Sequence, residues 1–286
     1  MAIVLDNITY TYGVGTPFEK TALHGVSLTV ENGEFLGIIG HTGSGKSTFV
    51  QHLNGLLHPT TGTVTVNGVD ISASTVEAKK MRHKVGMVFQ YPEHQLFEET
   101  IAEDIAFGPK NLGLSADEVD ERVRDAMKFV GLDYDTYAER SPFHLSGGQM
   151  RRVAIAGVVA MDPDFLVLDE PSAGLDPFGR EEIFEEIIRL HKEKGITVIL
   201  VSHNMEDISR MASRLVVLDK GRIVLDGQPM DIFNNHRDEL QAVGVDVPPV
   251  SVTMEYLREQ GLDVSNRVLS VDDAVQAILE GGSHVK

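Results

Sequence analysis

The chain of 286 residues contains no cysteine and no tryptophan. The absence of cysteine excludes disulfide bonds, cysteine-ligated zinc and thiol catalysis. The longest apolar run, residues 153–161, is far shorter than the ~20 residues that a membrane-spanning helix needs. Residues 1–10 show no basic segment followed by an apolar one, so we expect no signal peptide. Any membrane association should therefore be peripheral and depend on a partner.

Basic residues are also scarce. The chain has 25 Lys and Arg against 43 Asp and Glu, which gives a net charge of -18. Nucleic-acid binders usually carry a basic face, so we expect no nucleic-acid partner. Hydrophobic residues make up 42% of the chain, enough for a well-buried core. The length allows one large domain with an appendage, or two modest domains.

Two kinds of strand pattern occur along the chain. Apolar and polar residues roughly alternate in residues 2–12, 22–30 and 61–66, which predicts a small antiparallel sheet. Wholly apolar strands separated by helical stretches predict a parallel sheet covered on both faces. These strands are expected at residues 35–40, 85–89, 165–168, 197–201 and 214–218.

Helical patterns fill the remainder. Residues 90–161 are mostly helical in pattern, with Ser115 and Glu118 predicted to form a capping box before a helix at 116–130. Beyond Gly227 the pattern changes, and short helices are expected at residues 251–260 and 270–279, the latter capped by Ser270. We therefore expect an α/β domain over residues 1–228, with a helical subdomain at about 92–162, and a C-terminal extension over residues 229–286.

A phosphate-binding loop follows the first apolar strand. Its sequence, Gly40-His41-Thr42-Gly43-Ser44-Gly45-Lys46-Ser47, matches G-x-x-x-x-G-K-[ST] and precedes a helix expected at residues 47–57, in which Thr48 lies in the first turn. Glycines let backbone N–H groups approach phosphate oxygens, and the helix dipole adds about 0.3–1 kcal/mol per exposed charge. Lys46 is predicted to reach the β- and γ-phosphates, and Ser47 to ligate Mg²⁺. The sequence thus predicts ATP and Mg²⁺ as cofactors.

Two carboxylates lie at the end of a later strand. Asp169 and Glu170 directly follow four apolar residues, at the strand end where sheet proteins place ligand chemistry. We expect Asp169 to bind Mg²⁺ directly or through water. Glu170 is the candidate general base for the attacking water, a role typically worth roughly 10²–10⁴-fold in rate.

A second anion site precedes another helix. In Leu145-Ser146-Gly147-Gly148-Gln149, Ser146 can cap the helix and the two glycines expose N–H groups to a ligand. One chain cannot easily place both helix ends around one triphosphate, whereas a head-to-tail dimer can. The sequence therefore favours an ATP-driven dimer.

Together these motifs resemble the ATP-binding cassette (ABC) ATPases over residues 2–227. The resemblance implies that Tyr12 stacks on adenine, with Tyr10 as the rival. It also implies that Gln90 reaches Mg²⁺ and the attacking water and couples the site to a transmembrane partner. His203 resembles the switch histidine that holds the γ-phosphate. Residues 172–176, ending in Asp176, resemble the loop that contacts the opposite subunit.

Residues 89–108 and the tail after Gly227 resemble the ATPases of energy-coupling factor transporters, and residues 93–99 look most like the second of their two ATPases. These machines import vitamins or transition-metal ions. The resemblance implies a second ATPase (a paralogue or the chain itself), a transmembrane coupling protein, a small membrane substrate-binding protein, and a place on the cytoplasmic face of the membrane. Glu98, Glu99 and Asp104 are available to arginines of the coupling helices. The tail is expected to add ATPase–ATPase contact.

Other interpretations remain open. An ABC importer of another class fits the same motifs. A non-transport ABC ATPase is less favoured, because Ser47 and Leu145 are only 98 positions apart (145 − 47), without coiled-coil heptads, zinc cysteines or a second cassette. A non-hydrolysing nucleotide-binding regulator does not account for Gln90, Glu170 and His203 together.

Overall fold

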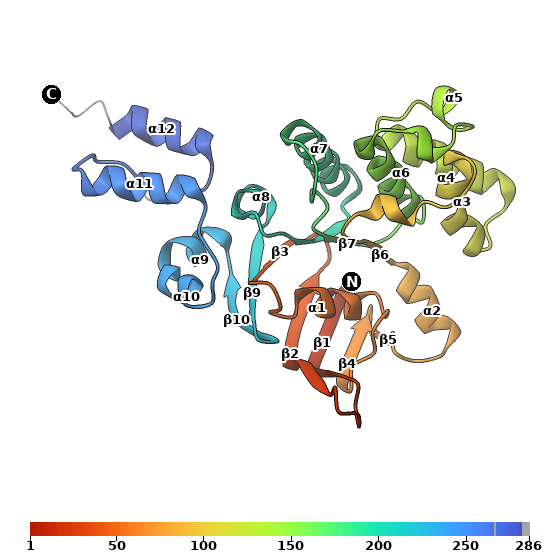
Figure 1. Cartoon of the computed structure of the whole chain (residues 1–286), viewed down its shortest axis with the longest axis horizontal. Coiled ribbons are helices and arrows are strands. Elements are labelled where there is room, and N and C mark those ends of the chain that lie inside the picture. Colours follow the sequence, from red (N-terminus) through yellow and green to blue (C-terminus); the bar gives the residue numbers. More distant parts are fainter. Residues whose placement is uncertain (266, 282–286) are drawn as a thin grey trace.

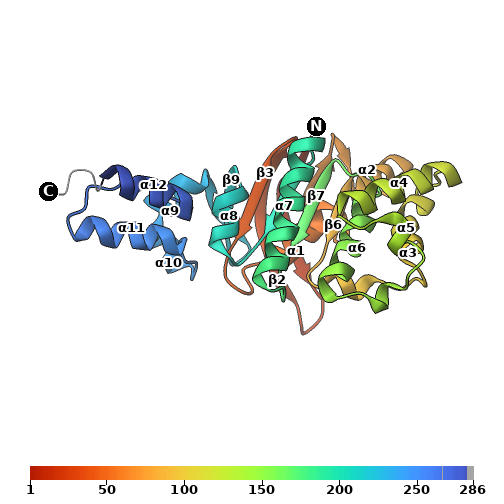
Figure 2. The ribbon, with the colours of Figure 1, turned by 90° about the horizontal axis from the view of Figure 1, so that it is seen from above.

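The computed structural model describes residues 1–265 and 267–281. A central sheet lies between a helical subdomain at one end and a helical tail at the other (Figure 1, Figure 2). The strand order is β10-β9-β3-β8-β7-β6, and the pairings are parallel except β9 with β10. The strands are β3 (Phe35–Ile39), β6 (Val85–Val88), β7 (Phe165–Asp169), β8 (Thr197–Val201), β9 (Arg214–Asp219) and β10 (Arg222–Gly227). The predicted α/β class is confirmed.

The core sheet is buried on both faces, which explains why its strands are apolar throughout. In β7, Leu166 and Leu168 pack into the cluster formed with the helices on one face. Phe165 and Val167 pack into the opposite cluster, with Phe49 of α1 (Lys46–Leu53) and the second sheet. Side chains alternate across a strand, so each strand must be apolar on both sides.

The second sheet is antiparallel, as predicted, with the order β2-β1-β4-β5. It contains β1 (Ala2–Tyr12), β2 (Lys20–Glu31), β4 (Thr61–Val66) and the short β5 (Val69–Asp70). Ile3, Leu5 and, after an irregularity in β1, Ile8 face the shared core, and the intervening residues are more exposed. One face of the core sheet is therefore covered by another sheet and α1 rather than by helices alone.

The helical subdomain follows β6 and returns to β7. It contains η1 (Pro92–Gln95), α3 (Ile101–Asn111), α4 (Ala116–Phe129), α5 (Tyr134–Tyr137), η2 (Pro142–His144) and α6 (Gly147–Val159). Ser115 and Glu118 form the predicted capping box at the start of α4. The buried face of α4 carries Val119, Val123 and Met127, which recur at the helical period.

Besides α1, further helices outside this subdomain connect or cover the core strands. They are α2 (Val76–His83), α7 (Pro177–Lys194) and α8 (Met205–Met211). The helix predicted at residues 47–57 instead ends at Leu53, since Gly55 adopts a positive φ of 74°. That left-handed conformation ends the helical path.

The tail is the segment from α9 onward. It contains α9 (Pro229–Asn235), α10 (Arg237–Ala242), α11 (Pro249–Glu259) and α12 (Val271–Gly281). Leu240 of α10 belongs to the main core, whereas Met254 and Ala274 join a small cluster between α11 and α12. Residues 282–286 of the predicted extension lie outside the described part of the chain. Across residues 1–265 and 267–281, none of the helices combines the length and apolar character that a membrane span requires.

Candidate active site

The phosphate-binding loop joins β3 to α1. Gly40 has φ 154°, and a Cβ there would lie 2.3 Å from the carbonyl oxygen of Leu218, so a larger residue cannot fit. Gly45, with φ 107°, is the left-handed residue at the N-terminus of α1. Both glycines thus hold the loop in its turn, with the helix N-terminus at its end.

Lys46 lies across this loop and is only 7% exposed. Its Nζ donates hydrogen bonds to the carbonyl oxygens of Gly40 at 2.6 Å and His41 at 3.0 Å. Burial lowers the pKa of Lys46, while the neighbouring carboxylates of Glu170 and Asp169 act to raise it. The ammonium group is therefore held beside the loop, and within the described residues it forms no ion pair with a carboxylate, which leaves its charge available to an anion.

Most of the predicted loop residues line one cavity, but the side chains of His41 and Ser44 do not. Thr42, Gly43, Gly45, Lys46, Ser47 and Thr48 line a cavity of about 570 Å³. The His41 side chain points elsewhere, because its Nε2 lies 2.8 Å from Asp219 Oδ1 and its Nδ1 2.8 Å from the Thr42 carbonyl oxygen. His41 can therefore offer only its backbone to a phosphate.

Ser44 is fully buried, and its Oγ has no hydrogen-bond partner within the described residues.

The acidic strand end opens into the same cavity. Burial raises the pKa of Asp169, and a hydrogen bond from the Ser47 hydroxyl acts to lower it. Ser47 and Asp169 thus bring two oxygen donors together, and oxygen is the ligand type that Mg²⁺ prefers. The pair fits the predicted metal role.

Glu170 has an unusual backbone and an unusual ionisation. Its φ of 51° is in the left-handed region, sparsely populated by residues other than glycine. Burial, followed by the charge of Asp169, raises the pKa of Glu170 to about 7. Its Oε1 has no hydrogen-bond partner within the described residues. A carboxylate with a pKa near neutrality is suited to accept a proton from water.

Gln90 and His203 also line the cavity, as does Tyr12. The Tyr12 hydroxyl lies 3.0 Å from Thr48 Oγ1, and the ring is 42% exposed. Tyr10 does not line the cavity; its ring packs edge-on against Tyr12 and His52. Of the two tyrosines, the position of Tyr12 suits a base-stacking role and that of Tyr10 suits a packing role.

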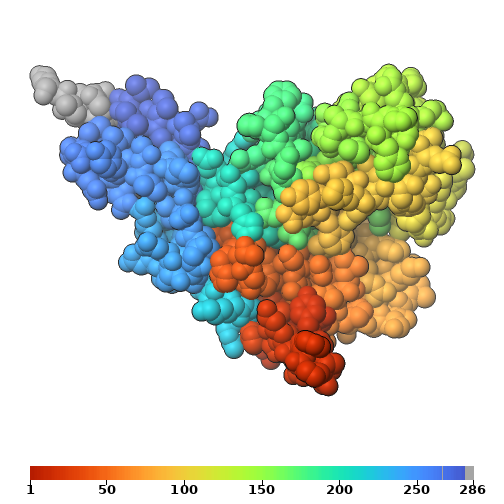
Figure 3. Space-filling model, viewed as in Figure 1, coloured from red at the N-terminus to blue at the C-terminus, as the bar shows by residue number. Residues whose placement is uncertain are grey.

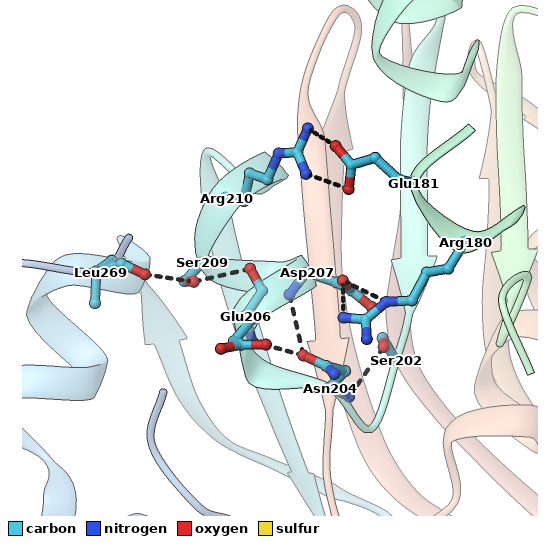
Figure 4. A network of polar contacts seen from close by, with 9 residues as sticks. All are labelled: Arg180, Glu181, Ser202, Asn204, Glu206, Asp207, Ser209, Arg210 and Leu269. Carbon is cyan, nitrogen blue, oxygen red and sulfur yellow. Dashed lines mark hydrogen bonds and ion pairs between the residues drawn. The ribbon is translucent and has the colours of Figure 1, made fainter. Parts of the chain in front are cut away.

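The segment after β8 is organised by a polar network shown in Figure 4. Asn204 caps α8 by accepting the N–H groups of Glu206 at 2.8 Å and Asp207 at 3.3 Å. Arg180 of α7 forms an ion pair with Asp207, whose pKa is raised by burial. These contacts attach α8 to α7, which begins at the Asp176 cap. His203 is therefore presented from a fixed turn.

The predicted second anion site, Leu145-Ser146-Gly147-Gly148-Gln149, is called the signature from here on, and it lies apart from this cavity. Ser146 caps α6 by accepting the Gln149 N–H at 3.3 Å, as predicted, and the Ser146 N–H donates to Gln149 Oε1. A Cβ on Gly147 or Gly148 would meet nothing within 4 Å, so the helix start is open. In this chain Leu145, the signature residues after it and Asp176 are not among the cavity-lining residues.

Several lining residues escaped prediction: Lys20, Thr21, Ala22, His24, Lys220 and Gly221. Lys20 to His24 are on β2, and no sequence motif marks them. The turn at Lys220-Gly221 follows a strand end, a position that could have been singled out by the rule applied to Asp169. Lys20, Lys46 and Lys220 thus bring three cationic side chains to a cavity that Asp169 and Glu170 also line.

Comparisons with known proteins agree with this geometry. The protein-family model described as ABC transporter matches residues 23–173. The "Energy-coupling factor transporter ATP-binding protein EcfA2" of Clostridium tetani is 53% identical over 280 residues, covering 98% of this chain and 97% of its own length. The protein of that name from Symbiobacterium thermophilum is 52% identical over 278 residues, covering 97% of this chain and 96% of its own.

Solved structures show the same fold. CbiO1 of Clostridium perfringens, described as part of the ABC transporter complex cbiONQ, is 36% identical with a TM-score of 0.73; the match covers 84% of this chain and 94% of that one. A dimer of the ATP-binding cassette MJ0796 bound to ADP and Pi is 31% identical with a TM-score of 0.70, covering 79% of this chain and 98% of that one.

Proposed function

Because this chain belongs to the ABC transporter family, among the ATP-binding subunits of energy-coupling factor transporters, we propose that its cavity binds and hydrolyses MgATP to power an importer. The observation that carries the proposal is the meeting of Lys46, Ser47 and Glu170 in one cavity with Gln90 and His203. These groups supply charge neutralisation, oxygen ligands, a base and residues that position water.

Each residue has an assigned role. Lys46 and the loop N–H groups bind the β- and γ-phosphates, and Tyr12 stacks on the adenine. Ser47, Asp169 and Gln90 hold Mg²⁺, which would neutralise phosphate charge when bound. Glu170 takes a proton from the attacking water, with His203 beside the γ-phosphate.

The signature requires a second cassette, either a paralogue or another copy of this chain. Ser146 and the open helix start of α6 lie outside the chain's own cavity. A head-to-tail pair places this second anion site over the ATP of the partner. Among the structural relatives, the ATP-binding cassette MJ0796 is described as a dimer in a post-hydrolysis state, bound to ADP and Pi. Closure of the pair then moves both helical subdomains.

The proposed docking surface for the membrane partner is formed by Phe97, Phe107, Glu98 and Glu99, which follow Gln90 in the chain. The exposed rings of Phe97 and Phe107 meet edge-to-face with centroids 4.9 Å apart. Glu98 and Glu99 lie beside Phe97 and offer negative charge to arginines of coupling helices. Asp104 instead supports the loop, since its carboxylate accepts N–H groups from Phe97 and Glu98. We assign this surface to a transmembrane coupling protein at the cytoplasmic face of the membrane.

The imported substrate, a vitamin or a transition-metal ion, is recognised by a separate small membrane protein. The test is affinity purification of the tagged chain from detergent-solubilised membranes of its own organism, read by mass spectrometry. A second cassette, a coupling protein and small binding proteins are expected. Recovery of two conventional permease subunits with a soluble binding protein would instead indicate another class of ABC importer.

A further inference from the structure

Arg151 is an arginine buried inside the domain. It lies on α6, five positions after the Ser146 cap, and only 1% of its surface is exposed. Val153, Ile155 and Ala156, which follow it on α6, belong to the main core. Burying a guanidinium costs free energy unless its N–H groups are paired. The partners of Arg151 therefore indicate its role.

The first partner is Glu93 of η1, three residues after Gln90. Arg151 Nε donates to Glu93 Oε2 at 3.0 Å, and Nη2 donates to Oε1 at 2.8 Å. Burial acts to raise the pKa of Glu93, but the hydrogen bonds and charge of Arg151, together with a backbone hydrogen bond and the charge of His94, hold this pKa below its usual value. The pair is therefore a charged, two-pronged contact between α6 and the turn after Gln90.

The second partner is the backbone that follows the candidate base. Arg151 Nη1 donates to the carbonyl oxygen of Pro171 at 3.0 Å and to that of Ala173 at 2.8 Å. Pro171 is the residue directly after Glu170, whose φ is 51°. The guanidinium thus holds the loop that fixes the direction of the Glu170 side chain.

These contacts join three segments that belong to two different ATP sites. In the proposed dimer, the signature at the start of α6 closes over ATP held by the partner cassette. Glu170 and Gln90 serve the ATP held by this chain. Resting on that proposed function, we propose that Arg151 is a positioning residue that couples the two ATP sites of the dimer. It makes the signature helix, the Glu93 turn and the loop after Glu170 move as one body.

The chemistry of arginine suits this role. Its planar fork offers N–H groups in two directions, so one edge binds a carboxylate while another reaches two carbonyl groups. A lysine has a single ammonium centre and cannot span Glu93, Pro171 and Ala173 at once. A shift of the signature toward a partner's ATP therefore displaces the Glu170 loop, and an error of about 1 Å in such a position can cost 10²-fold in rate.

The test uses the intact complex with its partner cassette and membrane subunits. ATP hydrolysis is measured against ATP concentration for the wild type, Arg151→Lys and Arg151→Met. The wild type should be cooperative, with a Hill coefficient between 1 and the limit of about 2 set by two sites. Both variants should lose cooperativity and fall about 10- to 100-fold in kcat. Their KM for ATP should stay unchanged, because Lys46 and the phosphate loop are intact.

Controls separate this role from a purely structural one. Arg124→Met removes an exposed arginine that pairs with Asp120 on α4 and should change neither kcat nor cooperativity. Should Arg151→Met fail to fold, adding Glu93→Gln removes the carboxylate left unpaired, and the double variant should still lack cooperativity. Rescue of cooperativity by Arg151→Lys would show that only the buried charge matters and would overturn the proposal.

The outcomes also distinguish a failure of the Arg151 coupling role from a failure of the proposed ATPase function. Hydrolysis by a wild-type complex without cooperativity would contradict the coupling role of Arg151 while leaving the proposed ATPase function intact. Loss of kcat with unchanged cooperativity in Arg151→Met would do the same. A wild-type complex that hydrolyses no ATP would contradict both.

Discussion

Glu170 Oε1 lies 3.4 Å from Nε2 of His203, at the ends of the adjacent strands β7 and β8. The Glu170 N–H donates to the carbonyl oxygen of Val201, which fixes the two strand ends together. Burial raises the pKa of Glu170 to about 7, and burial lowers that of His203 from its usual 6.5. The carboxyl group can thus exchange a proton near neutral pH while the imidazole stays uncharged.

The role of Glu170 is tested by Glu170→Gln. The amide cannot accept a proton from water, so we expect kcat for ATP hydrolysis to fall by roughly 10²–10⁴-fold. ATP binding should be preserved, and the stalled protein should accumulate as an ATP-bound dimer in size-exclusion chromatography. Glu181→Gln, an exposed glutamate that pairs with Arg210, is the matched control. Hydrolysis near the wild-type rate in Glu170→Gln would remove this residue from the base role.

Alanine variants distinguish the roles of Tyr10 and Tyr12. Tyr12→Ala should weaken ATP binding by about 5- to 150-fold, since stacking on an aromatic ring is worth roughly 1–3 kcal/mol per base. Tyr12→Phe keeps the ring and should bind normally. Tyr10→Ala should leave affinity unchanged and lower the melting temperature, because its ring packs against the core. Isothermal titration calorimetry with ATP measures the affinity of each variant, and thermal unfolding measures its melting temperature. The reverse pattern would assign stacking to Tyr10.

The acidic surface beside Phe97 predicts a charge-dependent contact. Reversing Glu98 and Glu99 to lysine should repel arginines on the coupling helices and reduce co-purification with the membrane partner. ATP binding by the separate chain should not change. The matched control reverses Asp117 and Glu121, which are exposed on α4 of the same subdomain. Equal recovery of the membrane partner with both double variants would exclude Glu98 and Glu99 from the contact.

The tail is expected to strengthen the ATPase dimer. The cut should be made after Pro248, because Leu240, Val245 and Val247 belong to the main core and an earlier cut at about residue 235 would damage it. Removing α11 and α12 should raise the dissociation constant by about tenfold, or ~1.4 kcal/mol. Analytical ultracentrifugation with ATP measures this on the Glu170→Gln background. A dissociation constant equal to that of the full chain would argue against a dimer role for these helices.

Glu186 of α7 predicts a dependence of stability on pH. Burial raises its pKa from the usual 4.5 to about 7, although Arg152 and Arg189 act to lower it. Its Oε2 has no hydrogen-bond partner within the described residues. Between pH 4.5 and 7 the folded chain therefore holds more protons here than the unfolded chain, so stability falls as pH rises.

The variant Glu186→Gln isolates this contribution. It should remove a pH-dependent loss of roughly 2–3 kcal/mol that is complete above pH 7, and so stabilise the protein more at pH 8 than at pH 5. Thermal unfolding of both proteins at the two pH values measures it. Parallel curves, with the same difference in melting temperature at both pH values, would contradict the predicted titration.

Patterns among neighbouring residues predicted many of the strands and helix caps of this chain. The wholly apolar strands, the capping box at Ser115 and the N-cap at Ser146 depend on neighbours in sequence, and the structure confirms them. The strand β10 was missed because it pairs at one edge and alternates in exposure, a pattern without the continuous apolar signal. Arg151 was missed because its partners at 93 and 171–173 are distant in sequence. The neighbouring Arg152 carries the same charge, so the local sequence does not single out Arg151.

The end of the tail has a small hydrophobic core of its own, which lies between α11 and α12. Met254, Val264, Val268 and Ala274 fill it, and the Ser209 hydroxyl donates to the Leu269 carbonyl oxygen where the tail meets α8. In the space-filling view a hollow separates these helices from α7 (Figure 3). Surface substitutions on the end of the tail can thus accumulate during evolution without reaching the ATP cavity. After gene duplication, two cassettes can therefore come to prefer different dimerisation partners while the residues of the ATP cavity stay the same.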